Sequence, residues 1–167
     1  MSHDKAGKTN AARQLDALGI QYELRSYEVD PDDLTAISVA HKIGMPAEQV
    51  FKTLVTRTSE GEHLFAVVPG DVELDLKKLA AVAGTRKIEL AAPKDVEPLT
   101  GYIRGGVTVL AAKKAFPAFA DETIELFDVV SVSAGLRGLQ LVLAPADYLH
   151  ATKATLADIS KSSGGHA

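Results

Sequence analysis

The amino-acid sequence predicts an α+β fold in which helices pack on a mixed β-sheet, and three observations lead to this prediction. Short runs of β-branched and apolar residues recur along the chain and predict strands. Stretches with apolar residues at helical spacing lie between these runs. The two kinds of segment do not alternate strictly, as they do in proteins built from βαβ units. With 167 residues, the chain is long enough for a single domain with a buried core.

The first half of the chain predicts two helices and three strands. Thr9 is a suitable N-cap for a first helix, because its hydroxyl can accept an amide hydrogen bond, and Gly19 stands where a C-terminal glycine belongs. We expect residues 9–160 to form the domain, between flexible tails at 1–8 and 161–167. The other segments expected here are a strand at 22–27, a helix at 35–43, and strands at 50–55 and 63–68 that pair as a hairpin.

The second half of the chain begins with a helix that Asp75 caps and Gly84 ends. A glycine-rich loop at 100–106 then leads into an expected strand at 107–110. The remaining expected segments are a strand at 87–90, a helical turn at 93–99, a strand starting near 116, a hairpin of strands 129–133 and 139–143, and a helix at 145–153.

Composition and charge exclude several classes of function. The net charge of −4 argues against a free-standing, high-affinity nucleic-acid binder, so no DNA partner is expected. The chain has no cysteine, which excludes a thiol nucleophile, a disulfide framework and a cysteine-ligated zinc site. Its five histidines show no metal-ligand spacing, so we expect neither a metal nor a cofactor. No apolar run could span a bilayer and the N-terminus has no apolar signal segment, which favours a cytoplasmic protein without a membrane partner.

Lys52 stands out because it is a cation within an apolar, strand-forming run. Strand side chains alternate between faces, so Lys52 and Leu54 lie on one face while Phe51 and Val55 lie on the other. If the Phe51 face packs on the core, Lys52 points into water, which is the usual place for a lysine. If the Lys52 face borders a cleft, the lysine puts a positive charge where a substrate binds.

Gly105 and Gly106 form a second candidate site. Paired glycines let a ligand approach the backbone and can direct N–H groups at an oxygen atom, but they also occur in tight turns and bulges. The pattern of a phosphate-binding P-loop is absent. Gly135 and Gly138 on either side of Arg137 form another candidate loop, for which a hairpin turn is the simpler interpretation.

Five short motifs, in this order, resemble the YbaK/prolyl-tRNA-synthetase-associated domain family, and in particular its free-standing YbaK/EbsC-type aminoacyl-tRNA deacylases. The motifs are Phe51-Lys52-Thr53-Leu54, Leu74-Asp75-Leu76-Lys77-Lys78, Thr100-Gly101-Tyr102, Gly105-Gly106-Val107 and Ser133-Ala134-Gly135-Leu136-Arg137-Gly138-Leu139. The resemblance runs from about residue 9 to about residue 159.

This resemblance implies a single α+β domain with a mixed, barrel-like sheet and flanking helices. It implies a trans-editing enzyme that deacylates mischarged tRNA, in this branch Cys-tRNA(Pro) and Cys-tRNA(Cys), with aminoacyl-tRNA as partner and prolyl-tRNA synthetase as a further one. By the same resemblance, Lys52, Gly105 and Gly106 would be catalytic. The residues that would contact substrate are Tyr27, Thr108, Gly135, Arg137 and Gln140.

The chain departs from the family pattern at two places. The family usually has Ser-Pro-Leu-Gly after the glycine pair, where this chain has Thr108-Val109-Leu110-Ala111, and an aspartate where this chain has Gln140. Both departures bear on which amino acid is removed. Two alternatives therefore stay open: an enzyme for Ala-tRNA(Pro), and a non-catalytic module that binds aminoacyl-tRNA or a synthetase.

Overall fold

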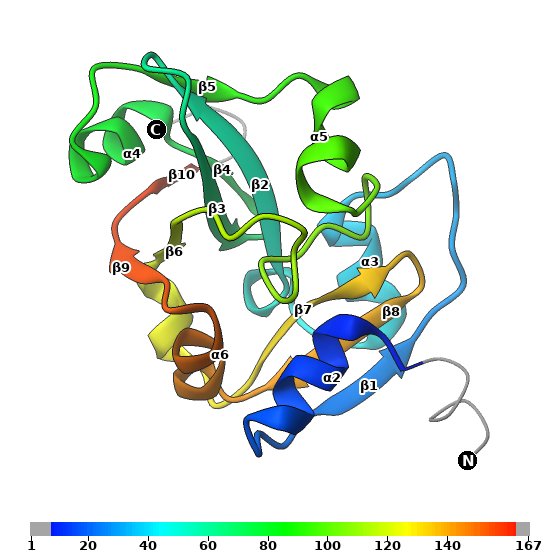
Figure 1. Cartoon of the computed structure of the whole chain (residues 1–167). Coiled ribbons are helices and arrows are strands. Elements are labelled where there is room, and N and C mark those ends of the chain that lie inside the picture. Colours follow the sequence, from blue (N-terminus) through cyan, green and yellow to red (C-terminus); the bar gives the residue numbers. More distant parts are fainter. Residues whose placement is uncertain (1–7, 163–167) are drawn as a thin grey trace.

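The computed structural model describes residues 8–162 (Figure 1). Of the tails expected at 1–8 and 161–167, residues 1–7 and 163–167 lie outside the described residues. Lys8, the last residue of the expected N-terminal tail, forms an ion pair of 2.7 Å with Asp16. The last strand reaches Ser162, two residues into the segment expected to be a C-terminal tail.

The largest sheet is mixed, as the sequence predicts, and has five strands. Its strands follow the order β5 (Ile88–Leu90), β2 (Phe51–Thr58), β3 (His63–Pro69), β6 (Ala118–Asp121) and β9 (Thr155–Ala157). The pairs β2–β3 and β2–β5 are antiparallel, whereas β3–β6 and β6–β9 are parallel. The expected hairpin of β2 and β3 is therefore confirmed.

A second, antiparallel sheet has the order β1 (Glu23–Ser26), β8 (Leu139–Leu143) and β7 (Val130–Leu136), and β4 (Val72–Leu74) pairs with β10 (Ser160–Ser162). The two larger sheets meet at one parallel bridge between Val50 and Ser131. The mixed α+β fold is confirmed, but the sheet does not close into a barrel, because β2 and β7 diverge after this single bridge.

The helices begin and end at the capping residues that the sequence indicates. Thr9 accepts a hydrogen bond from Ala12 N–H, and Asp75 accepts bonds from the first turn of its helix. Gly44 and Gly84 end two helices in the left-handed conformation, which glycine adopts without strain. The helices are α2 (Asn10–Ala17), α3 (Ala36–Ile43), α4 (Leu76–Ala83), α5 (Pro93–Thr100) and α6 (Pro145–Thr152), with 3-10 turns η1 (Ala47–Gln49) and η2 (Glu122–Leu126). None of the helices in the described part of the chain is long and apolar enough to cross a membrane.

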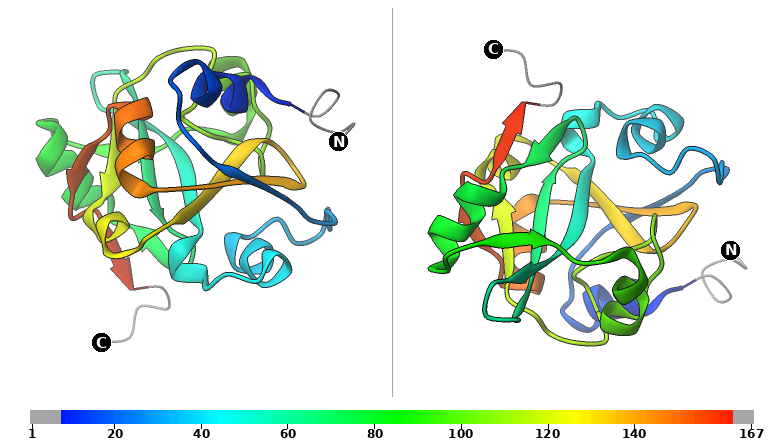
Figure 2. Two further views of the ribbon diagram at one scale, coloured as in Figure 1. Left: turned by 90° about the horizontal axis from the view of Figure 1, so that it is seen from below. Right: turned by 90° about the horizontal axis from the view of Figure 1, so that it is seen from above.

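Helices α2 and α3 lie on opposite sides of the β1–β8–β7 sheet (Figure 2). Leu15 of α2 packs with Val132 and Leu141 in the largest apolar cluster. On the other side, Val39 of α3 packs with Val50 and Tyr27. The face of β7 and β8 turned away from α2 carries the buried polar residues Ser131, Ser133 and Gln140, and the candidate site described below lies there.

The expected strand at 107–110 is wrong, since these residues form an irregular loop. Thr108 and Leu110 are buried, and the Thr108 hydroxyl accepts a hydrogen bond from Leu110 N–H at 3.3 Å. A side chain that bonds a nearby main-chain amide competes with strand pairing, which explains why an apolar run with strand propensity forms a loop here.

Candidate active site

The β7–β8 hairpin is the centre of the candidate site. The register of the hairpin shifts between Ser133 and Leu136, so that Gly135 lies in a bulge with a φ of +99°. A methyl group on Gly135 would lie 3.0 Å from the Tyr102 ring. Glycine is required at this position by its backbone conformation and by the close approach of the tyrosine.

The glycine pair forms a tight turn that packs on the end of this hairpin. Gly106 N–H donates to the carbonyl of Ile103 at 2.8 Å. A methyl group on Gly106 would lie 3.3 Å from the main chain of Leu136 and Arg137. The Arg137 Nε donates to the carbonyl of Arg104 at 2.7 Å and ties the turn to the hairpin. Arg137 therefore positions the glycine turn.

One hydrogen bond of Gly106 bears on the hypothesis that the glycine pair directs N–H groups at a substrate oxygen. Its N–H closes the turn and is not free to bind a substrate oxygen. Within residues 8–162, the N–H groups of Gly105 and Val107 donate to no protein acceptor, so these two amides are the candidates to contact substrate. The absence of a side chain at Gly106 lets the turn approach the hairpin, and its catalytic role stays a prediction.

Tyr27 lies beside the same hairpin turn. Its N–H donates to the carbonyl of Gly138 at 3.0 Å. The Lys42 ammonium lies 6.0 Å from the centre of its ring, and the ring packs against the apolar cluster that contains Val50. Tyr27, Gly105, Gly135 and Arg137, which are far apart in the sequence, therefore meet around one turn.

Lys52 is partly buried, on the face of β2 that it shares with Leu54 and with Val50 just before the strand. Phe51 points the other way, into the largest apolar cluster. Val50 is bridged in parallel to Ser131, and side chains of bridged residues lie on the same side of a sheet. Lys52 therefore lies on the same side as the polar residues of β7. That Lys52 borders a substrate cleft stays a prediction.

Burial lowers the pKa of the Lys52 ammonium below its usual value, because a charged group is less stable where water is partly excluded. The nearby carboxylates of Glu73 and Asp71 oppose this shift. A partly dry lysine is a stronger partner for a negatively charged oxygen than one in open solvent.

Gln140 and Thr108 are enclosed by protein. The Oε1 of Gln140 accepts a hydrogen bond of 2.7 Å from the Ser131 hydroxyl, and both side chains are buried. Thr108 has no exposed surface. The hydrogen bond of Gln140 links the two strands of the hairpin, and that of Thr108 lies within the loop that follows the glycine pair. Contact of either side chain with a substrate stays a prediction. Among the described residues, no group of acidic or histidine side chains could hold a metal ion.

Two residues of the candidate site, Ser133 and Tyr102, were not predicted from the sequence. Ser133 accepts a hydrogen bond from Gly135 N–H at 3.0 Å and lies two residues after Ser131 on the polar face of β7. The alternation of Val130 and Val132 with these serines was the available signal. Tyr102, which packs on Gly135, stands within a motif of the family pattern but was given no role.

Replacing Glu73 by glutamine should lower the pKa of Lys52 further, because one of the two carboxylates that favour the charged ammonium is removed. The pKa can be followed by NMR titration of the lysine Cε carbon. Glu62→Gln, at the far end of the β2–β3 hairpin, is the matched control and should leave the titration unchanged. An unchanged midpoint in Glu73→Gln would mean that Glu73 does not act on Lys52.

Comparison with known proteins connects this geometry with a family. Residues 30–151 match the model of the aminoacyl-tRNA editing domain, and this range includes every element of the candidate site except Tyr27. The chain belongs to the aminoacyl-tRNA editing domain family. The resemblance found in the sequence motifs is thereby confirmed.

Relatives within this editing family differ in the substrate given in their names. EbsC of Enterococcus faecalis, a candidate Cys-tRNA(Pro)/Cys-tRNA(Cys) deacylase, is 41% identical over 92% of this chain and 93% of its own length. ProXp-y of Escherichia coli K12, a multifunctional Ser/Thr-tRNA deacylase, is 28% identical over 60% of this chain and 61% of its own. A crystal structure of a candidate trans-editing enzyme for prolyl-tRNA synthetase superposes with a TM-score of 0.76 at 26% identity, over 92% of this chain and 98% of that one.

Proposed function

We propose that this protein is a trans-editing deacylase that cleaves the ester of mischarged tRNA, with Cys-tRNA(Pro) and Cys-tRNA(Cys) as its substrates. The observation that carries this proposal is the partly buried Lys52 on β2, two residues after the bridge that joins its sheet to β7 of the hairpin. The similarity to EbsC along nearly the whole of both chains supports the choice of amino acid. Such an enzyme acts in the cytoplasm, with prolyl-tRNA synthetase as a partner.

The chemistry requires little more than positioning and charge. An aminoacyl ester is already activated, so stabilising the negative charge that develops on its carbonyl oxygen can supply much of the rate. Lys52 would interact with this oxygen or with the terminal phosphate. The free N–H groups of Gly105 and Val107 would hold the carbonyl or a ribose oxygen. Tyr27 would orient a ribose hydroxyl or a water molecule.

A cysteinyl substrate can supply its own nucleophile. The thiol sulfur attacks the ester carbonyl of the same residue, a carbon–sulfur bond forms, and the bond to the ribose oxygen breaks. The proton of the thiol passes to the released ribose oxygen, so the tRNA leaves with a free hydroxyl, and water then opens the cyclic thioester. This route suits a protein whose sequence contains no cysteine.

The test is a panel of charged tRNAs: Cys-tRNA(Pro), Cys-tRNA(Cys), Ala-tRNA(Pro), Ser-tRNA and Thr-tRNA, with a deacylation rate for each. We expect the two cysteinyl substrates to be cleaved at least about tenfold faster than the others, since only they carry a thiol in reach of the ester. S-methylated Cys-tRNA(Pro) should be cleaved at the slow rate of the other substrates.

Other results of the panel identify the alternatives. Faster cleavage of Ala-tRNA(Pro) would assign the protein to that substrate, and faster cleavage of Ser-tRNA or Thr-tRNA would place it nearer to ProXp-y. Binding of aminoacyl-tRNA without cleavage of any substrate would identify a non-catalytic module. Gln140, which stands where the family pattern has aspartate and bonds to Ser131, would then be the first residue to revert.

A further inference from the structure

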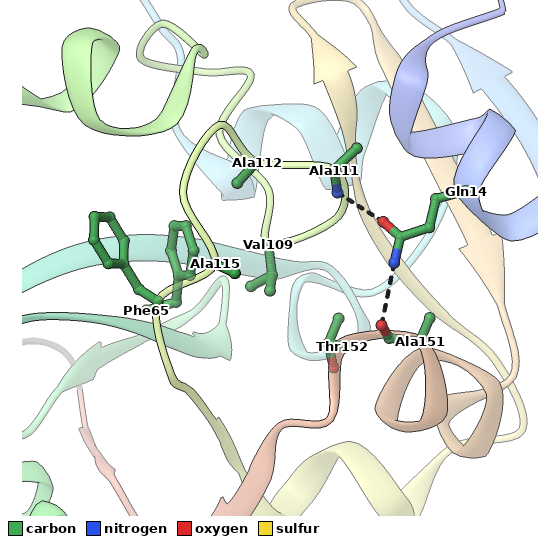
Figure 3. Close-up of a pocket in the computed structure, with 9 residues that line it drawn as sticks. Gln14, Phe65, Val109, Ala111, Ala112, Ala115, Ala151 and Thr152 are labelled. Carbon is green, nitrogen blue, oxygen red and sulfur yellow. Dashed lines mark hydrogen bonds between the residues drawn. The ribbon is translucent and has the colours of Figure 1, made fainter.

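One peptide group at the base of the glycine loop is held at both of its ends. The carbonyl of Leu110 accepts a hydrogen bond from the Tyr102 hydroxyl at 2.6 Å. The N–H of Ala111, in the same peptide group, donates to Oε1 of Gln14 at 2.7 Å. Figure 3 shows the Gln14 amide between this N–H and the carbonyl of Ala151, to which its Nε2 donates at 3.2 Å. Gln14 thus connects α2, α6 and the loop.

Ala111 adopts a conformation that alanine disfavours. Its φ is +52°, and it is the third residue of a turn in which Ala112 N–H donates to the carbonyl of Val109 at 3.4 Å. A positive φ at this position is typical of a type II turn and favours glycine. Alanine prefers the type I turn. Between type I and type II turns, the two dihedral angles that flank the central peptide differ by about 150° or more. The central peptide here is the one between Leu110 and Ala111.

A flip of this peptide would break both of its hydrogen bonds. Its carbonyl would turn away from Tyr102 and its N–H away from Gln14. Tyr102 packs on Gly135 beside the glycine turn, so its release would loosen the contact between the turn and the hairpin. The orientation of one peptide therefore connects Gln14 with the candidate site.

Packing leaves this part of the loop with little other support on one side. A pocket of about 320 Å³ lies between the end of α6 and the loop residues Val109, Ala111 and Ala112, and Phe65 lines it as well (Figure 3). Ala111 is exposed beside this pocket, so side-chain packing contributes little to holding its peptide. Leu110 is buried in the core, which anchors its side chain but does not set the direction of the following peptide.

We propose that Gln14 is a positioning residue that prevents the Leu110–Ala111 peptide from flipping and so keeps Tyr102 and the glycine turn in place for catalysis. The proposal rests on the deacylase function proposed above. Gln14 does not touch the substrate; it acts through Ala111 and Tyr102. It offsets the strain of an alanine where glycine would fit.

The test is Gln14→Met, which keeps an unbranched side chain of similar size but cannot accept the N–H of Ala111. We expect kcat to fall about tenfold, because small displacements of positioning groups carry costs of this order or larger, while KM for the aminoacyl-tRNA stays within about twofold. Adding Ala111→Gly to this variant should restore most of kcat, since glycine adopts positive φ without strain. Ala111→Gly alone should leave kcat unchanged.

Thr9→Ala is the matched control for the stability of α2. It removes the N-cap hydroxyl, which accepts a hydrogen bond from Ala12 N–H at 3.2 Å. It should lower the melting temperature at least as much as Gln14→Met and leave kcat unchanged. A Gln14→Met enzyme with wild-type kcat, an equal loss of kcat in Thr9→Ala, or no rescue by Ala111→Gly would overturn the proposal.

Amide exchange of Ala111 separates this proposal from the function on which it rests. The Ala111 N–H should exchange at least about tenfold faster in Gln14→Met than in the wild type, whether or not the protein cleaves any tRNA. If the wild type cleaves none of the charged tRNAs, the proposed function fails, and the exchange rate still tests the contact. Unchanged exchange would overturn the role of Gln14 directly.

If Gln14→Met does not fold, a second variant keeps the proposal testable. Gln14→Glu keeps an acceptor for Ala111 N–H and should retain both slow exchange and kcat. Loss of either would count against the proposal.

Discussion

Replacing Lys52 by alanine should lower the rate of deacylation about a hundredfold and leave the protein folded. A cation that stabilises developing negative charge in a partly dry site contributes roughly 3 kcal/mol to lowering the barrier, which corresponds to this factor. The change should cost little stability, about half a kcal/mol, because the side chain is only partly buried and its own desolvation is relieved. Thermal melts and rates on Cys-tRNA(Pro), measured on the same preparations, are the experiment.

Two further lysine variants test whether the loss of activity is specific to the Lys52 ammonium. Lys52→Arg should recover little activity, because a planar guanidinium does not occupy the place of a compact ammonium. Lys94→Ala removes an exposed lysine on α5 and should leave the rate unchanged. Wild-type activity in a normally melting Lys52→Ala protein would remove Lys52 from the mechanism, and an unfolded variant would show that the lysine is structural.

The lowered pKa of Lys52 also predicts a pH dependence in which activity and stability change in opposite directions. As the pH rises through the pKa of Lys52 in the folded protein, which lies below 10.5, the ammonium loses its charge and the deacylation rate, corrected for spontaneous ester hydrolysis, should fall. Between that pKa and 10.5, the unfolded chain binds more protons than the folded protein. The contribution of Lys52 to stability should therefore rise with pH in this window. Lys52→Ala should show neither effect.

Replacing Gly135 by alanine should lower both stability and activity. The backbone of Gly135 has a φ of +99°, and the new methyl group would lie 3.0 Å from the Tyr102 ring. Strain and overpacking together should cost about 3 kcal/mol, which corresponds to a drop of about 10 °C in the melting temperature of a protein of this size. Displacement of Tyr102 should lower kcat at least about tenfold.

Gly61→Ala is the control that separates backbone strain from the displacement of Tyr102. Gly61 has a φ of +88°, and a methyl group there would meet only the end of the Arg57 side chain, at 3.7 Å. This variant should lose stability through strain alone and keep its kcat. If Gly135→Ala melts no lower than Gly61→Ala and deacylates at the wild-type rate, then the Tyr102–Gly135 contact does not support the site.

Much of the local structure could be predicted because it depends on neighbouring residues. The cap at Thr9, the cap at Asp75 and the glycine that ends α4 act within one helical turn, so their residue types indicate where helices begin and end. The two hairpins follow from short turns between strand-forming runs. Lys52 attracted attention for a local reason as well, as the charge that interrupts an apolar strand.

The sequence by itself therefore determined the class of fold, most of its elements and the family, because each of these depends on local patterns and short motifs. Only the tertiary structure shows which part of the chain lies beside the Lys52 face of β2, because that depends on the bridge between Val50 and Ser131. It decided that the Gly106 amide closes a turn, a hydrogen bond that residue types do not specify. It also placed Gln14 against Ala111, 97 residues away in the chain, a contact that only the packing of α2 beside the loop creates.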